Sequence, residues 1–96
     1  MDVSSLQSPG AVDKNTARAT VRQFVVENFL FGQGGDLTDE TSFLEQGIVD
    51  STGILELVAF LEGTYGMNVD DSELTPENLD SIDAIVAFLS RRFALA

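Results

Sequence analysis

Residues 47–66, GIVDSTGILELVAFLEGTYG, contain the clearest helical signal in this 96-residue chain. Five apolar residues recur there at intervals of three and four positions, as on one face of an α-helix: Ile54, Leu57, Val58, Leu61 and Tyr65. Gly66 follows as a helix terminator. We therefore predict an amphipathic helix that begins near the Asp50-Ser51 pair, ends at Tyr65 and buries one face.

Similar signals predict helices on both sides of this segment. A first helix is expected from about Asp13 or Asn15 to Phe31, where glycines end the apolar pattern. Thr75 is expected to cap a short helix with Pro76 at its first position and Leu79 as its inward anchor. Ser81 is expected to cap a last helix, whose buried stripe comprises Ile82, Ile85, Val86, Leu89 and Phe93.

The predicted fold is all-α: a small antiparallel four-helix bundle with three longer helices and one short helix. A long loop, residues 32–50, joins the first two helices. It contains five apolar residues, which indicates a loop pinned over the core: Leu37, Phe43, Leu44, Ile48 and Val49. Residues 1–12 lack any apolar period and are expected to be a flexible tail, so the domain spans residues 13–96.

Composition narrows the possible functions. The net charge is −11 with no cysteine and no histidine, and the segment from Gln23 to Ser90 has fourteen acidic residues but no lysine or arginine. Such a surface is a poor partner for nucleic acid or anionic lipid, whereas basic proteins would be attracted to it. There is no signal peptide pattern and no apolar run near the roughly 20 residues that span a bilayer. We expect a soluble cytoplasmic monomer without disulfides.

The residues argue against an enzyme. Ser51 is the obvious nucleophile, but catalysis would need a neighbouring base, and the chain has no histidine. The acidic runs Asp36–Glu40 and Asp70–Glu73 lack the ligand spacing of a calcium-binding EF-hand loop, so no dedicated metal site is expected. Gly32, Gly34 and Gly35 lack the strand and the Lys-Ser/Thr of a phosphate-binding loop.

Two interpretations of Ser51 then stay open. It is either a plain helix N-cap or an acceptor that another enzyme modifies. The apolar Ile48-Val49 pair would hold the approach to the serine, and the positive end of the helix dipole would favour a phosphodiester attached there. Glu56 and Glu62, which lie off the apolar stripe, would offer a basic enzyme a surface to bind.

The segment FLEQGIVDSTGILELV, Phe43 to Val58, resembles the phosphopantetheine attachment motif of the acyl carrier protein family, which includes peptidyl and D-alanyl carriers. The resemblance covers about residues 15–93. Tyr65-Gly66 at the end of the second helix and the run LTPENLDSI, residues 74–82, support it. It implies a non-enzymatic carrier in which Ser51 accepts 4′-phosphopantetheine from coenzyme A, and the thiol of this arm holds acyl groups as thioesters.

The same resemblance implies roles for neighbouring residues and partners. Asp50 matches the acidic residue before the serine. Four positions match the surface where partner enzymes dock: Thr52, Glu56, Ala59 and Glu62. The implied partners are a holo-synthase or phosphopantetheinyl transferase, which brings its own Mg²⁺, and acyl-transferring enzymes with basic docking surfaces.

The motif departs from the family's common Asp-Ser-Leu-Asp, because Thr52 and Gly53 follow the serine here. Asp-Ser-x-Gly is similar to D-alanyl carriers and to free-standing carriers loaded by an AMP-forming ligase. We therefore expect a carrier for an amino acid or specialised acyl group. A housekeeping carrier of fatty-acid synthesis, an unmodified acidic interaction module and a small calcium-binding helical protein are the alternatives.

Overall fold

The computed structural model describes residues 13–95. They form four α-helices: α1 (Lys14–Phe29), α2 (Ser51–Tyr65), α3 (Pro76–Leu79) and α4 (Ile82–Phe93). A single 3₁₀ turn, η3 (Asp71–Glu73), precedes α3 and was not predicted. No strand occurs among the described residues, so the all-α fold with one short helix and a long first loop is confirmed. The predicted tail, residues 1–12, lies outside this part of the chain.

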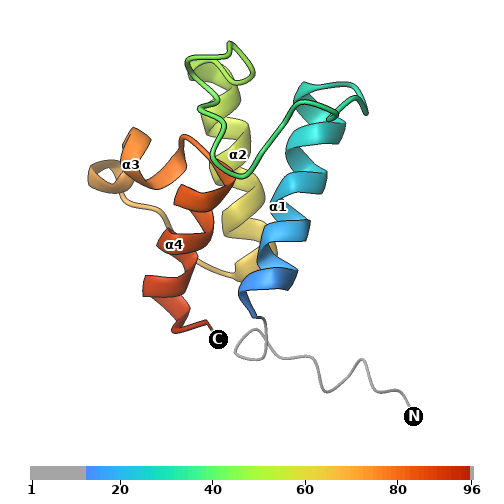
Figure 1. Cartoon of the computed structure of the whole chain (residues 1–96). Helices are drawn as coiled ribbons and strands as arrows, with labels where there is room; N and C mark the ends of the chain where they lie inside the picture. The colour runs from blue at the N-terminus through green and yellow to red at the C-terminus, as the bar shows by residue number, and fades with distance from the viewer. Residues whose placement is uncertain (1–12, 96) are drawn as a thin grey trace.

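The three longer helices lie side by side, and α3 sits beside α4 (Figure 1). The chain runs upward in this view through α1 and back down through both α2 and α4. The start of α2 therefore lies at the same end of the bundle as the end of α1. In the described chain, no helix has the length and apolar character needed to cross a membrane.

Helix α1 begins as predicted but ends earlier. The Asp13 side chain caps it by accepting a hydrogen bond from the Thr16 N–H at 2.8 Å. The helix stops at Phe29, and Phe31 then adopts a left-handed conformation with φ of 53°. This turn directs Phe31 away from the bundle, so its side chain is 87% exposed. The prediction that Phe31 belongs to the first helix and its apolar face was wrong.

The later helices end and begin at the residues that the sequence indicated. Gly66 has a left-handed φ of 63° after α2, and the Ser81 side chain caps α4 by accepting from the Ala84 N–H at 3.0 Å. Thr75 holds the N-cap position of α3 with Pro76 next, although its side chain makes no capping bond. The buried stripe of α4 is confirmed except at Phe93, which is only partly buried.

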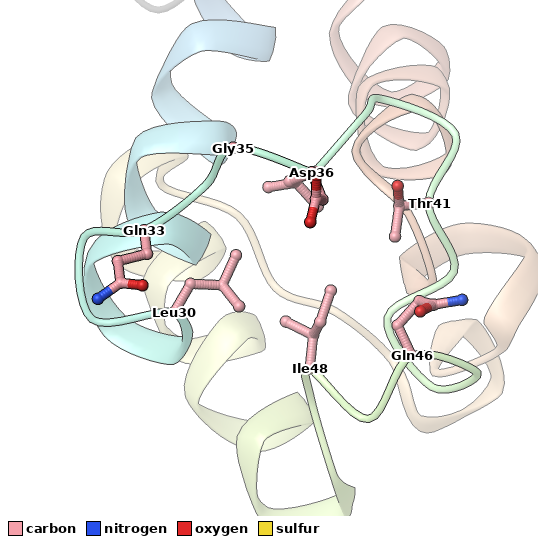
Figure 2. Close-up of a pocket in the computed structure, with 8 residues that line it drawn as sticks. Leu30, Gln33, Gly35, Asp36, Thr41, Gln46 and Ile48 are labelled. Atoms are coloured by element: carbon pink, nitrogen blue, oxygen red, sulfur yellow. The ribbon is translucent and has the colours of Figure 1, made fainter.

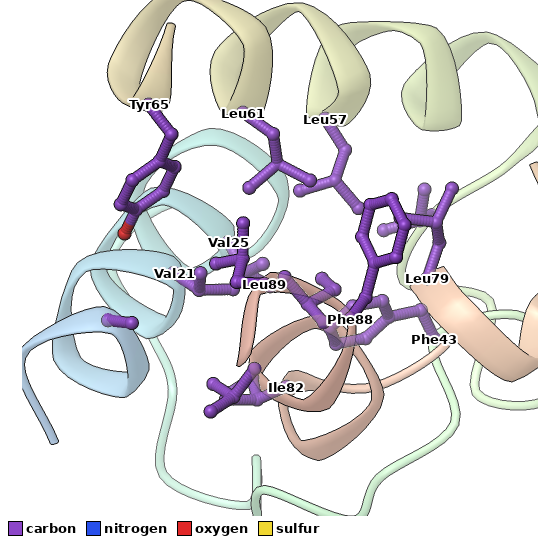
Figure 3. Packing of buried hydrophobic residues seen from close by; sticks show 14 of the residues in the cluster. Val21, Val25, Phe43, Leu57, Leu61, Tyr65, Leu79, Ile82, Phe88 and Leu89 are labelled. Atoms are coloured by element: carbon purple, nitrogen blue, oxygen red, sulfur yellow. The ribbon is translucent and has the colours of Figure 1, made fainter. Parts of the chain in front are cut away.

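The core lies between α1, α2 and α4 (Figure 3). Its fully buried larger side chains come from all four helices and from the loop: Val21, Val25, Phe43, Val49, Leu57, Leu61, Leu79, Ile82, Ile85 and Leu89. Burying each such side chain stabilises the fold by about 1.5–3 kcal/mol relative to its exposed state. The Phe43 N–H also donates to the Asp80 carbonyl at 2.8 Å, which fixes the loop against the end of α3.

The long loop is pinned over the core, as predicted. Leu37, Phe43 and Val49 are buried, whereas Leu44 is 47% exposed, so its inclusion among the pinning residues was wrong. The reason is local: Phe43 fills the core position, and its neighbour is directed outward.

Two arginines of α1 add polar anchors to the loop. Arg22 donates to the Leu37 carbonyl at 2.8 Å and to Asp39 at 2.7 Å. Arg18 bonds Asp39 at 3.3 Å and also Asp83 of α4. The hydrogen bond to Asp83 raises the pKa of Arg18, with its partial burial opposing this. These side chains connect the loop, α1 and α4.

The C-terminal arginines have a similar role. Arg91 and Arg92 lie in the last turn of α4, where the helix dipole favours cations. Arg92 bonds Glu73 at 3.1 Å and the Asn68 carbonyl at 2.6 Å, and Arg91 bonds Asn78 at 2.7 Å. They therefore hold the segment between α2 and α4 against the bundle.

Candidate functional site

Ser51 is the first residue of α2 and is exposed. The N-cap is Asp50, whose Oδ1 accepts a hydrogen bond from the Gly53 N–H at 2.7 Å. Its extended backbone, with φ of −102° and ψ of −171°, is typical of that position. The interpretation of Ser51 as the N-cap was therefore wrong.

The Ser51 hydroxyl is left available by this arrangement. It makes no hydrogen bond to any residue between 13 and 95. It sits in the first turn of a 15-residue helix, where unpaired N–H groups carry partial positive charge. An anionic phosphodiester on this oxygen would be stabilised there. The chain has no histidine that could act as a base for the Ser51 hydroxyl.

Gly53 is buried because α1 packs closely against the first turn of α2. A Cβ atom at this position would lie 2.9 Å from Cε1 of Phe29 and 3.0 Å from Cγ1 of Val49. Phe29 in turn meets Phe24 edge to face at 5.7 Å, and Phe24 stacks on Phe60 at 4.1 Å. The close packing of Phe29 and Val49 on this position explains why glycine follows Asp-Ser-Thr in this chain.

The exposed face of α2 contains three of the four predicted docking residues. Thr52, Glu56 and Ala59 are exposed and follow one another at intervals of four and three positions, so they share a face. Leu55 is 61% exposed beside them. It was missed, although its position outside the apolar stripe was a visible signal.

Glu62 differs from the other docking positions. It is partly buried, and its Oε2 accepts a hydrogen bond from the Val69 N–H at 2.9 Å. This bond holds the segment after α2 against the helix. The docking role of Glu62 stays a prediction, with one of its oxygens already bonded inside the chain.

Exposed apolar side chains gather near Ser51. Within residues 13–95 the large exposed hydrophobic residues are Phe31, Leu44 and Leu55. Leu44 lies in the loop that leads to Ser51 and Leu55 one turn after it. Phe31 follows Phe29, whose ring packs on Gly53. All three therefore lie at the Ser51 end of the bundle.

Two cavities of different character flank the Ser51 end of the bundle. A groove of about 90 Å³ between α2 and α3 is lined by Leu44, Ile54, Leu74, Thr75, Pro76, Leu79 and Asp80. A larger cavity of about 630 Å³ lies between the end of α1 and the long loop (Figure 2). Its lining mixes apolar and polar residues: Leu30, Gln33, Gly35, Asp36, Leu37, Thr41, Gln46 and Ile48.

The acidic runs considered as metal ligands do not come together. Among the described residues, no group of three or more acidic side chains could hold a metal ion. Asp39 instead pairs with Arg22 and Arg18, and Glu73 pairs with Arg92.

Comparison with known proteins finds a relative in sequence and similar solved structures. No protein-family model matches the chain. The chain is 31% identical over 67 residues to the "Probable acyl carrier protein PigG" of Serratia sp. (strain ATCC 39006). The aligned residues make up 70% of this chain and 77% of the relative. It is also similar to a chain in the "Crystal structure of FAD-dependent dehydrogenase", with a TM-score of 0.65 and 29% identity.

The structural match covers 72% of this chain and 97% of the other, so the matched chain is itself smaller than 96 residues. The match therefore concerns a small chain with the same helical architecture. The sequence identity to the carrier from Serratia agrees with this structural match, with the four-helix fold and with the exposed serine after Asp50. This protein therefore belongs to the acyl carrier protein family, whose members are non-enzymatic carriers.

Proposed function

We propose that the protein carries 4′-phosphopantetheine on Ser51 and holds acyl or aminoacyl groups as thioesters on the thiol of that arm. The observation that carries this proposal is the division of roles at the start of α2. Asp50 caps the helix, which leaves the adjacent Ser51 hydroxyl exposed and unbonded within residues 13–95. A serine needed only for capping would occupy the Asp50 position.

The residues around Ser51 fit this group. The Ser51 oxygen forms the new bond to phosphorus, the phosphoanhydride of coenzyme A breaks, and the nucleotide part of coenzyme A leaves. A phosphopantetheinyl transferase, or holo-synthase, accepts the serine proton and provides Mg²⁺. Unpaired N–H groups in the first turn of α2 would stabilise the negative charge of the phosphodiester.

Partner enzymes dock, on this proposal, on the exposed face of α2. Thr52, Leu55 and Ala59 provide apolar contact, and Glu56 provides charge for Arg and Lys of the partner. The excess of acidic residues between Gln23 and Ser90 steers such basic surfaces toward the carrier.

We infer a specialised pathway, with an AMP-forming ligase that loads an amino acid or a short acyl group. The groove between α2 and α3 has a volume of only about 90 Å³, which would hold a short group more readily than a long acyl chain. The structural match in an FAD-dependent dehydrogenase structure supports a flavin dehydrogenase as one downstream enzyme. The cytoplasm stays the expected location and a monomer the expected state.

A carrier of fatty-acid synthesis is the second candidate, because that groove is lined mostly by apolar side chains. Loading with an octanoyl group distinguishes the two candidates. Perturbed NMR signals of Ile54, Leu74 and Leu79 on loading would favour the fatty-acid carrier, and unchanged signals the specialised one.

Intact-mass measurement tests the attachment. The protein is incubated with coenzyme A, Mg²⁺ and a broad-specificity phosphopantetheinyl transferase. Wild type and Ser72→Ala, which removes another exposed serine, should each gain one phosphopantetheine, and Ser51→Ala should gain none. No gain in wild type, or a gain that persists in Ser51→Ala, would refute the proposal.

A further inference from the structure

The cavity between the end of α1 and the long loop has no role in the fold or in partner docking as described above. Its apolar floor comes from Leu30, Leu37 and Ile48. Figure 2 shows Leu30, Ile48 and Asp36 directed toward the same open space, with Gln33 and Gln46 at opposite sides of the rim. At about 630 Å³ it lies in the size range of small-molecule sites.

The rim offers hydrogen-bonding groups that residues 13–95 do not use. Among residues 13–95, the side chains of Gln33, Asp36 and Gln46 have no hydrogen-bond partner. Thr41 differs, because its hydroxyl accepts from the Thr38 N–H at 2.9 Å, so it adds mainly its methyl group to the wall. An apolar floor below free amides suits a ligand with both apolar and amide groups.

We propose that this cavity receives the pantetheine arm and its cargo, an inference that rests on the proposed function. The arm contains two amide groups and a pair of methyl groups, which match the glutamines of the rim and the apolar floor. The attachment point is near, since Ile48 of the cavity wall precedes Ser51 by three residues. The groove between α2 and α3 is about seven times smaller and mostly apolar.

The cavity also selects the class of cargo. Among residues 13–95, the lining contains one acidic residue, Asp36, and no basic residue. Arg18 and Arg22, which anchor the loop, donate to Asp39, Asp83 and the Leu37 carbonyl. A cationic group, such as the free α-ammonium of an aminoacyl thioester, would pair with Asp36, whereas an anionic cargo would be repelled.

Solution NMR of the ¹⁵N-labelled carrier tests the site. A phosphopantetheinyl transferase loads Ser51 with arms that end in an alanyl amide or a propionyl amide, which are stable mimics of the thioesters. The two differ only in the ammonium group. We expect the alanyl arm to shift the backbone amide signals of Leu37, Thr41 and Ile48, and the propionyl arm to shift them less than half as far.

Variants identify the group that pairs with the cargo. Asp36→Asn should remove at least half of the alanyl-specific shift. Glu45→Gln, which neutralises an exposed carboxylate of the same loop outside the cavity lining, should leave the shift intact. NMR signal changes confined to residues 50–56 or to the groove between α2 and α3 would overturn this inference. In that case the mass gain of the loaded protein would still support the proposed function. Absence of a mass gain would overturn both.

Discussion

Gly53→Ala tests the packing at the start of α2. The new Cβ would meet Cε1 of Phe29 at 2.9 Å, Cγ1 of Val49 at 3.0 Å and Oδ1 of Asp50 at 3.4 Å. Real Cβ atoms essentially never approach a neighbour to less than 3.0 Å, so Phe29 must move. The substitution therefore strains the contact between α1 and α2 beside the capping bond of Asp50.

The expected change in the free energy of unfolding of Gly53→Ala follows from two opposing effects. Overpacking of a buried position costs about 1–3 kcal/mol. Alanine gains about 0.8–1.0 kcal/mol over glycine inside a helix. The net loss in the free energy of unfolding is about 0–2 kcal/mol. Gly63→Ala is a matched control, because it lies in the same helix, is exposed, and its new Cβ would have nothing within 4 Å. It should gain about 0.4–1 kcal/mol.

Chemical denaturation followed by circular dichroism measures the difference between the two variants. Gly53→Ala should be less stable than Gly63→Ala by about 0.4–3 kcal/mol, which corresponds to at least about 2 °C in Tm for a domain of this size. Phe29→Leu, which removes Cε1, should reduce the cost of Gly53→Ala in the double variant. Equal stability of the two alanine variants would refute the packing argument.

Three further outcomes are expected. Asp50→Ala should cost about 1 kcal/mol in the free energy of unfolding and Asp50→Asn much less, because asparagine also caps; equal losses in urea titrations would contradict the cap. Leu55→Ser should leave Tm nearly unchanged but raise the KM of the transferase for the carrier about 5- to 30-fold. The reason is that burying this 61%-exposed side chain against the transferase contributes about 1–2 kcal/mol to binding. The control Ala87→Ser, on the exposed side of α4, should leave that KM unchanged. The bond from the Thr16 N–H lowers the pKa of Asp13 below 3.8, so its carboxylate stabilises the fold above that pH and loses this contribution as pH falls further. The stability of wild type relative to Asp13→Asn should therefore drop below pH 3.8, and a constant difference down to pH 2 would count against this cap.

The sequence was sufficient to predict a helix end wherever a residue with a strong preference for that position stands there. Gly66, Pro76 and Ser81 mark an end or a beginning by their own backbone or side-chain chemistry, and each lies where it was expected. Phe31 shows the limit. It continues the helical spacing of the first helix, and only the left-handed turn after Leu30 places it outside. Periodicity cannot report such a turn, since no glycine stands at that position.

The sequence indicated where the candidate site lies, but the details of its geometry depend on tertiary contacts. Asp and Ser are both favoured at helix N-caps, so residue preference could not decide between Asp50 and Ser51. The bond between Asp50 and the Gly53 N–H decides it. The packing of Phe29 on Gly53 joins residues 24 positions apart and was not visible in the sequence. The cavity was not visible in the sequence either, because its wall is formed by the loop that Phe43 and Arg22 hold in place.

The most direct test of the central claim is mass spectrometry of the protein purified from the cells that make it, with peptide mapping of the segment around Ser51. The proposed function predicts that this peptide alone carries phosphopantetheine and that a thioester-linked group, released by hydroxylamine, accounts for any further mass. An unmodified Ser51 in a protein that is active in those cells, or an arm on another residue, would contradict it.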